Sequence, residues 1–171
     1  MSEWQAIEAA VRELLGAGIR SASPLAGGSI HDVRRLELED GRDCVVKVAA
    51  AGSAGLLQGE ADGLEAIAAT GTVRTPAVFG LVRHEAVSVL AMEHLTPGPA
   101  AECDWGAFGR RLWNLHAGDV GARYGFAADN HIGRTPQVNR WCDDWVEFLV
   151  TCRLGPQLAM AVDHGRVDPA S

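Results

Sequence analysis

A lysine within an apolar strand and a glutamate on the apolar side of a helix are the residues that first indicate chemistry. Lys47 lies in the run 44–48, whose other residues are cysteine and valine. An unpaired charge buried there costs more free energy than it gains, so Lys47 needs an anionic partner. Glu60 follows Leu57 by three residues and precedes Leu64 by four, which places it on the apolar stripe of a helix. We therefore predict that Lys47 and Glu60 form an ion pair.

A glycine-rich turn precedes this lysine. Gly27, Gly28 and Ser29 lie between two predicted strands, where backbone N–H groups can cover the phosphates of a nucleotide. Such a turn, a strand lysine and a helix glutamate together form the amino-terminal half of a kinase site. However, the turn is not of the form G-x-G-x-x-G, and Lys47 could instead extend from an edge strand into water while Glu60 is solvated. These residues by themselves leave both interpretations open.

Composition restricts the class of protein. The 171 residues are enough for one domain or two small lobes, and the formal net charge of −7 argues against a nucleic-acid interface. No run approaches the length of a membrane span, and the amino terminus is an acidic amphipathic helix rather than a signal peptide. The four cysteines lack C-x-x-C spacing, so we expect reduced thiols in a cytoplasmic protein with no structural metal.

The order of predicted elements indicates an α+β fold. After a first helix, strands are predicted at 21–26, 32–38 and 44–48, then the Glu60 helix, then extended segments at 75–81 and 86–92. We expect a five-stranded antiparallel lobe over 1–95, with the Glu60 helix inserted, and a linker at 96–103. The remainder, 104–171, is predicted to be a partial helical lobe, with helices beginning after Asp104 and Asp144. Gly155 is expected to end the second of these, and Pro156 to begin a further helix that stops by Gly165.

Several short blocks stand out in the second half of the sequence. They are 124–126 (YGF), 129–133 (DNHIG), 135–137 (TPQ), 141–145 (WCDDW) and 153–158 (RLGPQL). With these blocks, which general kinases lack, the sequence resembles the fructosamine kinases, also called ketosamine-3-kinases, which share the protein-kinase-like fold. The resemblance extends from about residue 18 to residue 167.

The resemblance implies roles for individual residues. Gly27, Gly28 and Ser29 cover the nucleotide phosphates, and Lys47 with Glu60 forms the nucleotide-lysine pair. The segment Met92, Glu93, His94 and Leu95 is the hinge that meets the adenine edge of ATP. Asp129, Asn130 and His131 either line the sugar side of the cleft or satisfy the backbone of their own loop.

The chain departs from the family pattern where phosphoryl transfer takes place. The family's His-Gly-Asp catalytic loop, its following Asn and its later metal-binding Asp are expected beyond Ser171. His164 and Gly165 begin a similar segment, but Arg166 stands where an aspartate is required. We therefore assign no catalytic residue and no metal ligand, and we expect Mg²⁺ only in the complete enzyme.

The resemblance implies an ATP-dependent phosphotransferase that modifies the 3-hydroxyl of sugar ketoamines on lysines or small amines, a step in protein deglycation. A catalytically inactive nucleotide-binding or interaction module is the alternative from another class. A small-molecule kinase of the aminoglycoside phosphotransferase type is a third hypothesis, which the specific blocks disfavour. We also expect exposed apolar surface around the helices of 104–171, and hence self-association.

Overall fold

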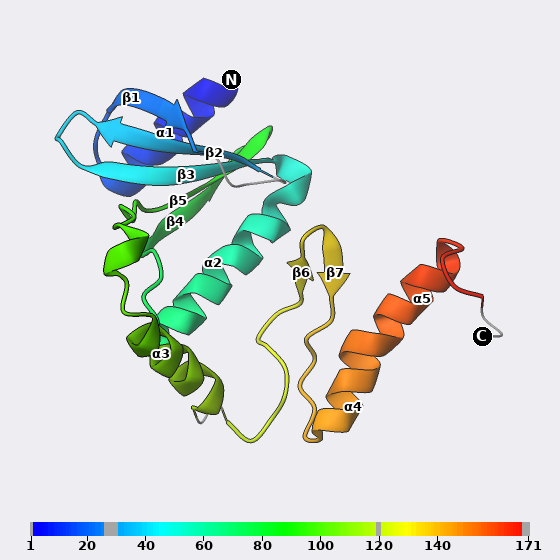
Figure 1. The fold of residues 1–171 in the computed structure, drawn as a ribbon. Coiled ribbons are helices and arrows are strands. Elements are labelled where there is room, and N and C mark those ends of the chain that lie inside the picture. The colour runs from blue at the N-terminus through cyan, green and yellow to red at the C-terminus, as the bar shows by residue number, and fades with distance from the viewer. Residues whose placement is uncertain (1, 26–30, 119–120, 169–171) are drawn as a thin grey trace. The chain divides into compact units, whose positions relative to one another are not determined.

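The computed structural model describes residues 2–25, 31–118 and 121–168, and the chain divides into two compact units, Met1–Gly118 and Asp119–Ser171 (Figure 1). Each unit is described separately below. The predicted lobe and linker boundaries, 1–95, 96–103 and 104–171, stay a prediction.

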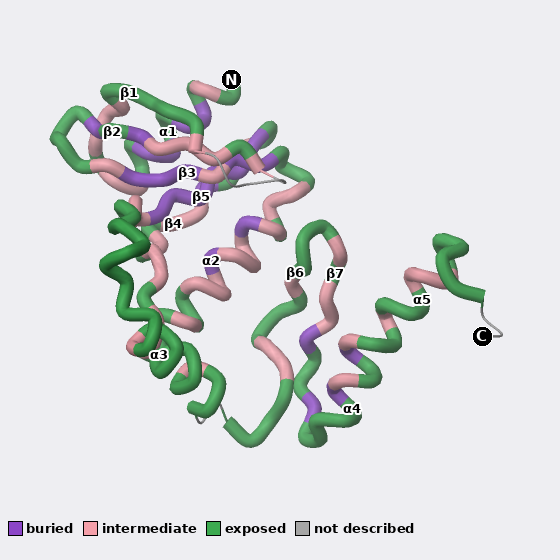
Figure 2. Tube along the Cα trace, in the orientation of Figure 1, coloured by how far each residue is buried: buried purple, intermediate pink, exposed green. Residues whose placement is uncertain are grey.

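The first unit contains a five-stranded antiparallel sheet in the order β1-β2-β3-β5-β4. Its strands are β1 (Ile19–Pro24), β2 (Asp32–Leu38), β3 (Asp43–Ala50), β4 (Val78–Arg83) and β5 (Val87–Glu93). The α+β fold with an antiparallel sheet is therefore confirmed. The central strands β3 and β5 are almost wholly buried (Figure 2), because helices cover both of their faces.

Helix α1 (Glu3–Leu15) covers one face of this sheet. A capping box begins it, in which the Ser2 hydroxyl accepts from the Gln5 N–H and the Gln5 side chain accepts from the Ser2 N–H. Gly16 ends the helix in the left-handed conformation, with φ of 69°. The buried side chains of α1, Ile7 and Val11 among them, pack against alternate residues of β2, β3 and β5.

Helix α2 (Ala54–Ala69) covers the opposite face, after a short 3₁₀ turn, η1 (Ala51–Ser53). Leu57 and Ala61 are its buried residues, and they pack with Val45, Leu90 and Met92 of the sheet. Because side chains alternate along a strand, β3 directs Val45, Lys47 and Ala49 toward α2 and the residues between them toward α1. The strand thus presents Lys47 to the helix that carries Glu60.

The first unit ends with a short 3₁₀ turn, η2 (Ala100–Glu102), and helix α3 (Trp105–Ala117). Asp104 caps α3, as predicted, by accepting a hydrogen bond of 2.8 Å from the Ala107 N–H. No residue of α3 is buried, and the side chains of Trp105 and Trp113 are 65% and 70% exposed. Exposed apolar surface on this helix was expected from the sequence.

The second unit contains a short hairpin of β6 (Asn130–Ile132) and β7 (Thr135–Gln137), followed by a continuous helix. This helix comprises α4 (Trp145–Leu149), the π-helical turn η3 (Val150–Leu154) and α5 (Gly155–Asp163). Its buried apolar cluster is small and consists of Cys142, Phe148 and Cys152, with Val138 packed against it (Figure 2).

Two features of the second unit differ from the sequence-based expectations. The hairpin was not predicted, because its polar residues and Pro136 hide the alternation typical of strands. The helix predicted from Pro156 is found as α5, but the predicted helix end at Gly155 is wrong. The Gly155 N–H donates to the Val150 carbonyl five residues back, so the chain passes through the π turn and continues as α5.

Two helical glycines give a direct test of this turn. A Cβ at Gly63 in α2 meets nothing within 4 Å, so we expect Gly63→Ala to stabilise the protein by about 0.5–1 kcal/mol. A Cβ at Gly155 lies 2.8 Å from the Val150 carbonyl oxygen, so Gly155→Ala should destabilise by about 1–3 kcal/mol. Urea denaturation of both variants measures this, and effects of the same sign would contradict the close contact at Gly155.

The described residues contain no disulfide, and all four cysteines are free. Burial, with a smaller contribution from the Asp43 charge, raises the pKa of the Cys44 thiol to about 11, so this thiol is inert at neutral pH. No helix within the part of the chain that the structure describes is long and apolar enough to cross a bilayer.

Candidate nucleotide site

The ion pair between Lys47 and Glu60 is the centre of the candidate site. Lys47 Nζ donates to Glu60 Oε1, which confirms the pairing expected from the sequence. The side chains are 25% and 29% exposed, so the pair is half-buried and open to solvent on one side. Lys47 lies between Val33 of β2 and Leu90 of β5, its cross-strand neighbours. These flanking strands and α2 fix the ammonium group in place.

The paired lysine keeps binding capacity. An ammonium group has three N–H donors, and Glu60 is the one acceptor that bonds Lys47 among the described residues. Two donors therefore remain for another anion, such as a phosphate. A carboxylate that holds a lysine while leaving donors free is the arrangement that kinases use for the nucleotide lysine.

The predicted phosphate-covering residues Gly27, Gly28 and Ser29 lie outside the described residues. The described residues Leu25 and Val33 lie close to the ion pair. The Leu25 N–H donates to the Val33 carbonyl at 2.9 Å, and Val33 is the cross-strand partner of Lys47. The role of Gly27, Gly28 and Ser29 stays a prediction.

The predicted hinge begins at the end of β5. Met92 is buried, and Glu93 fixes the strand end by three hydrogen bonds. Its N–H donates to the Ala77 carbonyl at 2.8 Å, and its carboxylate accepts from the Ala77 N–H at 3.2 Å and from Arg74 Nη2 at 2.6 Å. These donors hold the pKa of Glu93 below its ordinary value, so the carboxylate is ionised at neutral pH.

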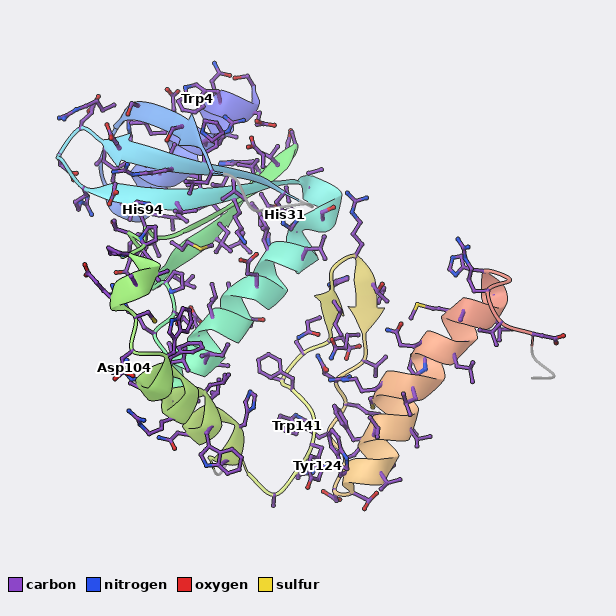
Figure 3. The ribbon with its side chains drawn as sticks, viewed as in Figure 1. Trp4, His31, His94, Asp104, Tyr124 and Trp141 are labelled. Atoms are coloured by element: carbon purple, nitrogen blue, oxygen red, sulfur yellow. The ribbon has the colours of Figure 1, made fainter. Side chains whose placement is uncertain are left out.

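His94 and Leu95 follow, and His94 lies just past the carboxyl-terminal end of β5 (Figure 3). His94 Nδ1 lies 2.7 Å from Asp43 Oδ2, which also accepts from Arg35 Nε at 3.0 Å. Partial burial acts to raise the pKa of Asp43, but the hydrogen bonds from His94 and Arg35 outweigh it and keep the pKa low. The side chains of Glu93 and His94 are thus both engaged within the protein, and the hinge role of the segment 92–95 stays a prediction.

Asp129, Asn130 and His131 belong to the second unit and have different surroundings. Asp129 Oδ1 accepts from the Asn139 N–H at 2.7 Å, so this carboxylate satisfies backbone of its own loop. Asn130 Oδ1 is buried and has no hydrogen-bond partner among the described residues. His131 is exposed at the hairpin, opposite Pro136.

Arg153 organises this hairpin, and the sequence reasoning did not assign it a role. It projects from the π turn, with its guanidinium carbon 4.4 Å from the centre of the Phe148 ring. It donates to the Val138 carbonyl and, at 2.7 Å, to Asn139 Oδ1. When the Gln137 amide oxygen faces the guanidinium, it accepts at 2.6 Å from Nη2. The position of Arg153 in the block 153–158 was the available signal.

No group of three or more histidine, cysteine, aspartate or glutamate side chains in the described ranges is arranged to hold a metal ion.

Comparison with known proteins identifies the family of this chain. The family model described as fructosamine kinase matches residues 3–170. A protein of Synechocystis sp. named probable ketoamine kinase is 35% identical over 160 residues, which cover 92% of this chain and 54% of that protein. A chloroplastic protein-ribulosamine 3-kinase of Arabidopsis thaliana is 35% identical over 153 residues, covering 85% of this chain and 45% of that protein.

Solved structures agree with the fold. The crystal structure of a candidate fructosamine-3-kinase from Haemophilus somnus matches with a TM-score of 0.83 and 24% identity, covering 95% of this chain and 55% of that one. The chain spans about half the length of the curated relatives it matches. Since the family match extends over nearly all of the sequence, the chain belongs to the fructosamine kinase family.

Proposed function

We propose that this chain forms the nucleotide-binding part of an ATP-dependent kinase that phosphorylates sugar ketoamines. The observation that carries the proposal is the Lys47–Glu60 pair, formed between β3 and α2 with two lysine donors left free. The names of the relatives, ketoamine kinase and protein-ribulosamine 3-kinase, support the substrate class. The acceptor in this proposal is the 3-hydroxyl of a ketoamine on a lysine or small amine, and the outcome is deglycation.

In this proposal each part of the site has a defined task. Lys47 binds the α- and β-phosphates of ATP, Glu60 orients Lys47, and the turn of Gly27, Gly28 and Ser29 covers the phosphates. Backbone groups of the segment 92–95 bind the adenine edge. ATP supplies the phosphoryl group, and Mg²⁺ neutralises the phosphate charge in the complete enzyme. Asn130 and His131 contact the substrate, while Asp129 supports their loop from within.

Calorimetric titration of the purified chain with ATP and, separately, with MgATP tests the proposal. The expected result is saturable binding that depends on Lys47, and a chain that binds neither form would overturn the nucleotide site. We also propose a cytoplasmic location, which the four free cysteines support.

An interaction module is the second candidate function, and the exposed face of α3 favours it. Trp105 and Trp113 expose most of their side chains, and clusters of exposed apolar surface commonly become interfaces. We therefore expect the chain to self-associate through α3.

Sedimentation should show a concentration-dependent increase in mass that Trp113→Gln reduces. Ile132→Gln in the second unit, where Ile132 is 61% exposed, is the control. A monomer at all concentrations would contradict this candidate.

A further inference from the structure

A cavity of about 590 Å³ lies in the first unit, away from the ion pair of Lys47. It is formed where the carboxyl-terminal end of α2 meets α3 (Figure 1), and its walls come from the end of α2, the turn after it and one face of α3. The residues that line it are Ala68, Gly71, Thr72, Val73, Arg74, Thr75, Arg111 and Asn114.

The charge of this cavity is opposite to that of the chain. Two guanidinium groups, those of Arg74 and Arg111, line it, and none of the described residues that line it carries a carboxylate, although the whole chain has a formal net charge of −7. Arg111 makes no hydrogen bond or ion pair with any described residue. Arg111 and Asn114 are three residues apart on α3, so their side chains lie on the same face of the helix.

Arg74 is partly engaged but keeps capacity for a ligand. Its Nη2 donates to Glu93 Oε1 at 2.6 Å, and a guanidinium has five N–H donors in all. Arg74 can therefore bind a second oxyanion while Glu93 holds its orientation. The Thr75 hydroxyl donates to the Leu64 carbonyl at 3.2 Å, which leaves its oxygen as a further acceptor on the cavity wall.

Guanidinium pairs select the planar or tetrahedral oxygens of carboxylates and phosphates, which they bind through two parallel hydrogen bonds. We propose that this cavity is an oxyanion-binding site for a small ligand with a phosphate or carboxylate group, with Arg111 and Arg74 as its anchors. Val73 and Ala68 supply the apolar part of the wall. The proposal does not depend on the kinase function.

The cavity is distinct from the ion pair of Lys47. Glu60 and Ala68 are eight residues apart in α2, which is about 12 Å along the helix axis. The cavity adjoins the predicted hinge through one contact, the bond from Arg74 to Glu93.

Calorimetric titration with inorganic phosphate and, separately, with succinate tests the proposal, in chloride buffer of constant ionic strength. The wild-type chain should bind at least one of the two saturably, and the one that binds identifies the ligand class. Arg111→Gln should weaken binding about tenfold, which corresponds to loss of one charged hydrogen-bonding group. Arg110→Gln is the matched control. It removes the same charge from the adjacent position of α3, and Arg110 does not line the cavity.

Two further variants make every outcome decisive. Lys47→Met should retain phosphate binding, so loss of binding there would assign the anion to the nucleotide site and overturn the proposal. Asn114→Ala should also weaken binding, and it provides a second measurement if Arg111→Gln alters the helical signal in circular dichroism. Equal affinity in wild type, Arg111→Gln and Asn114→Ala, or no saturable binding of either anion, would equally overturn the site.

Discussion

Replacement of Lys47 by methionine is expected to weaken ATP binding by about 10- to 100-fold, the loss of one or two charge-assisted hydrogen bonds to phosphate. The methionine side chain is similar in length and apolar, so the packing between Val33 and Leu90 is retained. Calorimetry or displacement of a fluorescent nucleotide measures the affinity. Unchanged affinity in Lys47→Met would contradict the proposed role of the pair.

The role of Glu60 is separable from that of Lys47 by a double-mutant cycle. Glu60→Gln keeps the shape of the side chain but removes the charge that orients the ammonium, so a smaller loss is expected. In the double variant the effects should not add, because both act on the same phosphate contact. Arg83→Gln is the control for net charge, since Arg83 lies on β4 and donates to Gln58. Its affinity for ATP should equal that of the wild type.

Replacement of Arg153 by methionine is expected to destabilise the second unit by about 2–4 kcal/mol, because it leaves buried acceptors without donors. Asn139 is 2% exposed, and its side-chain oxygen accepts from Arg153, as does the Val138 carbonyl. Hydrogen exchange should become faster throughout β7 and η3, and urea unfolding monitored through Trp141 and Trp145 should shift to lower concentration.

Two variants distinguish this effect from a general loss of positive charge. Arg140→Gln removes an exposed guanidinium that bonds Thr151 and Glu147, so it should change stability far less than Arg153→Met does. Arg153→Lys keeps one charged donor but not the planar group that reaches two acceptors at once, so it should recover only part of the loss. Equal exchange rates in Arg153→Met and the wild type would show that the hairpin stands without this contact.

The features that the sequence predicts correctly are those determined by residues close together in the sequence. Alternation along β3 and helical spacing along α2 are properties of neighbouring residues, and each placed one charge on an apolar face. The pairing of Lys47 with Glu60 followed because neither charge could be buried alone. The cap at Asp104 was likewise predictable from a short pattern.

The remaining features depend on contacts between distant residues. The bonds from Arg153 to Val138 and Asn139 span fifteen and fourteen residues, and no spacing rule connects a helix arginine to the residues that follow a hairpin. Gly155 was interpreted as a helix end because glycine commonly has that role. Only the observed bond to Val150 shows that the chain needs a missing Cβ there to form a π turn.

Lys47 is the only lysine in the chain, and the other fourteen basic residues are arginines. Reducing sugars form Schiff bases with neutral primary amines, so the chain offers them a single side-chain amine, and that amine is ion-paired and only 25% exposed. A protein proposed to repair glycated lysines therefore exposes almost no lysine surface of its own to glycation. Because Lys47 is that single side-chain amine, a sugar adduct on it would block the candidate nucleotide site directly.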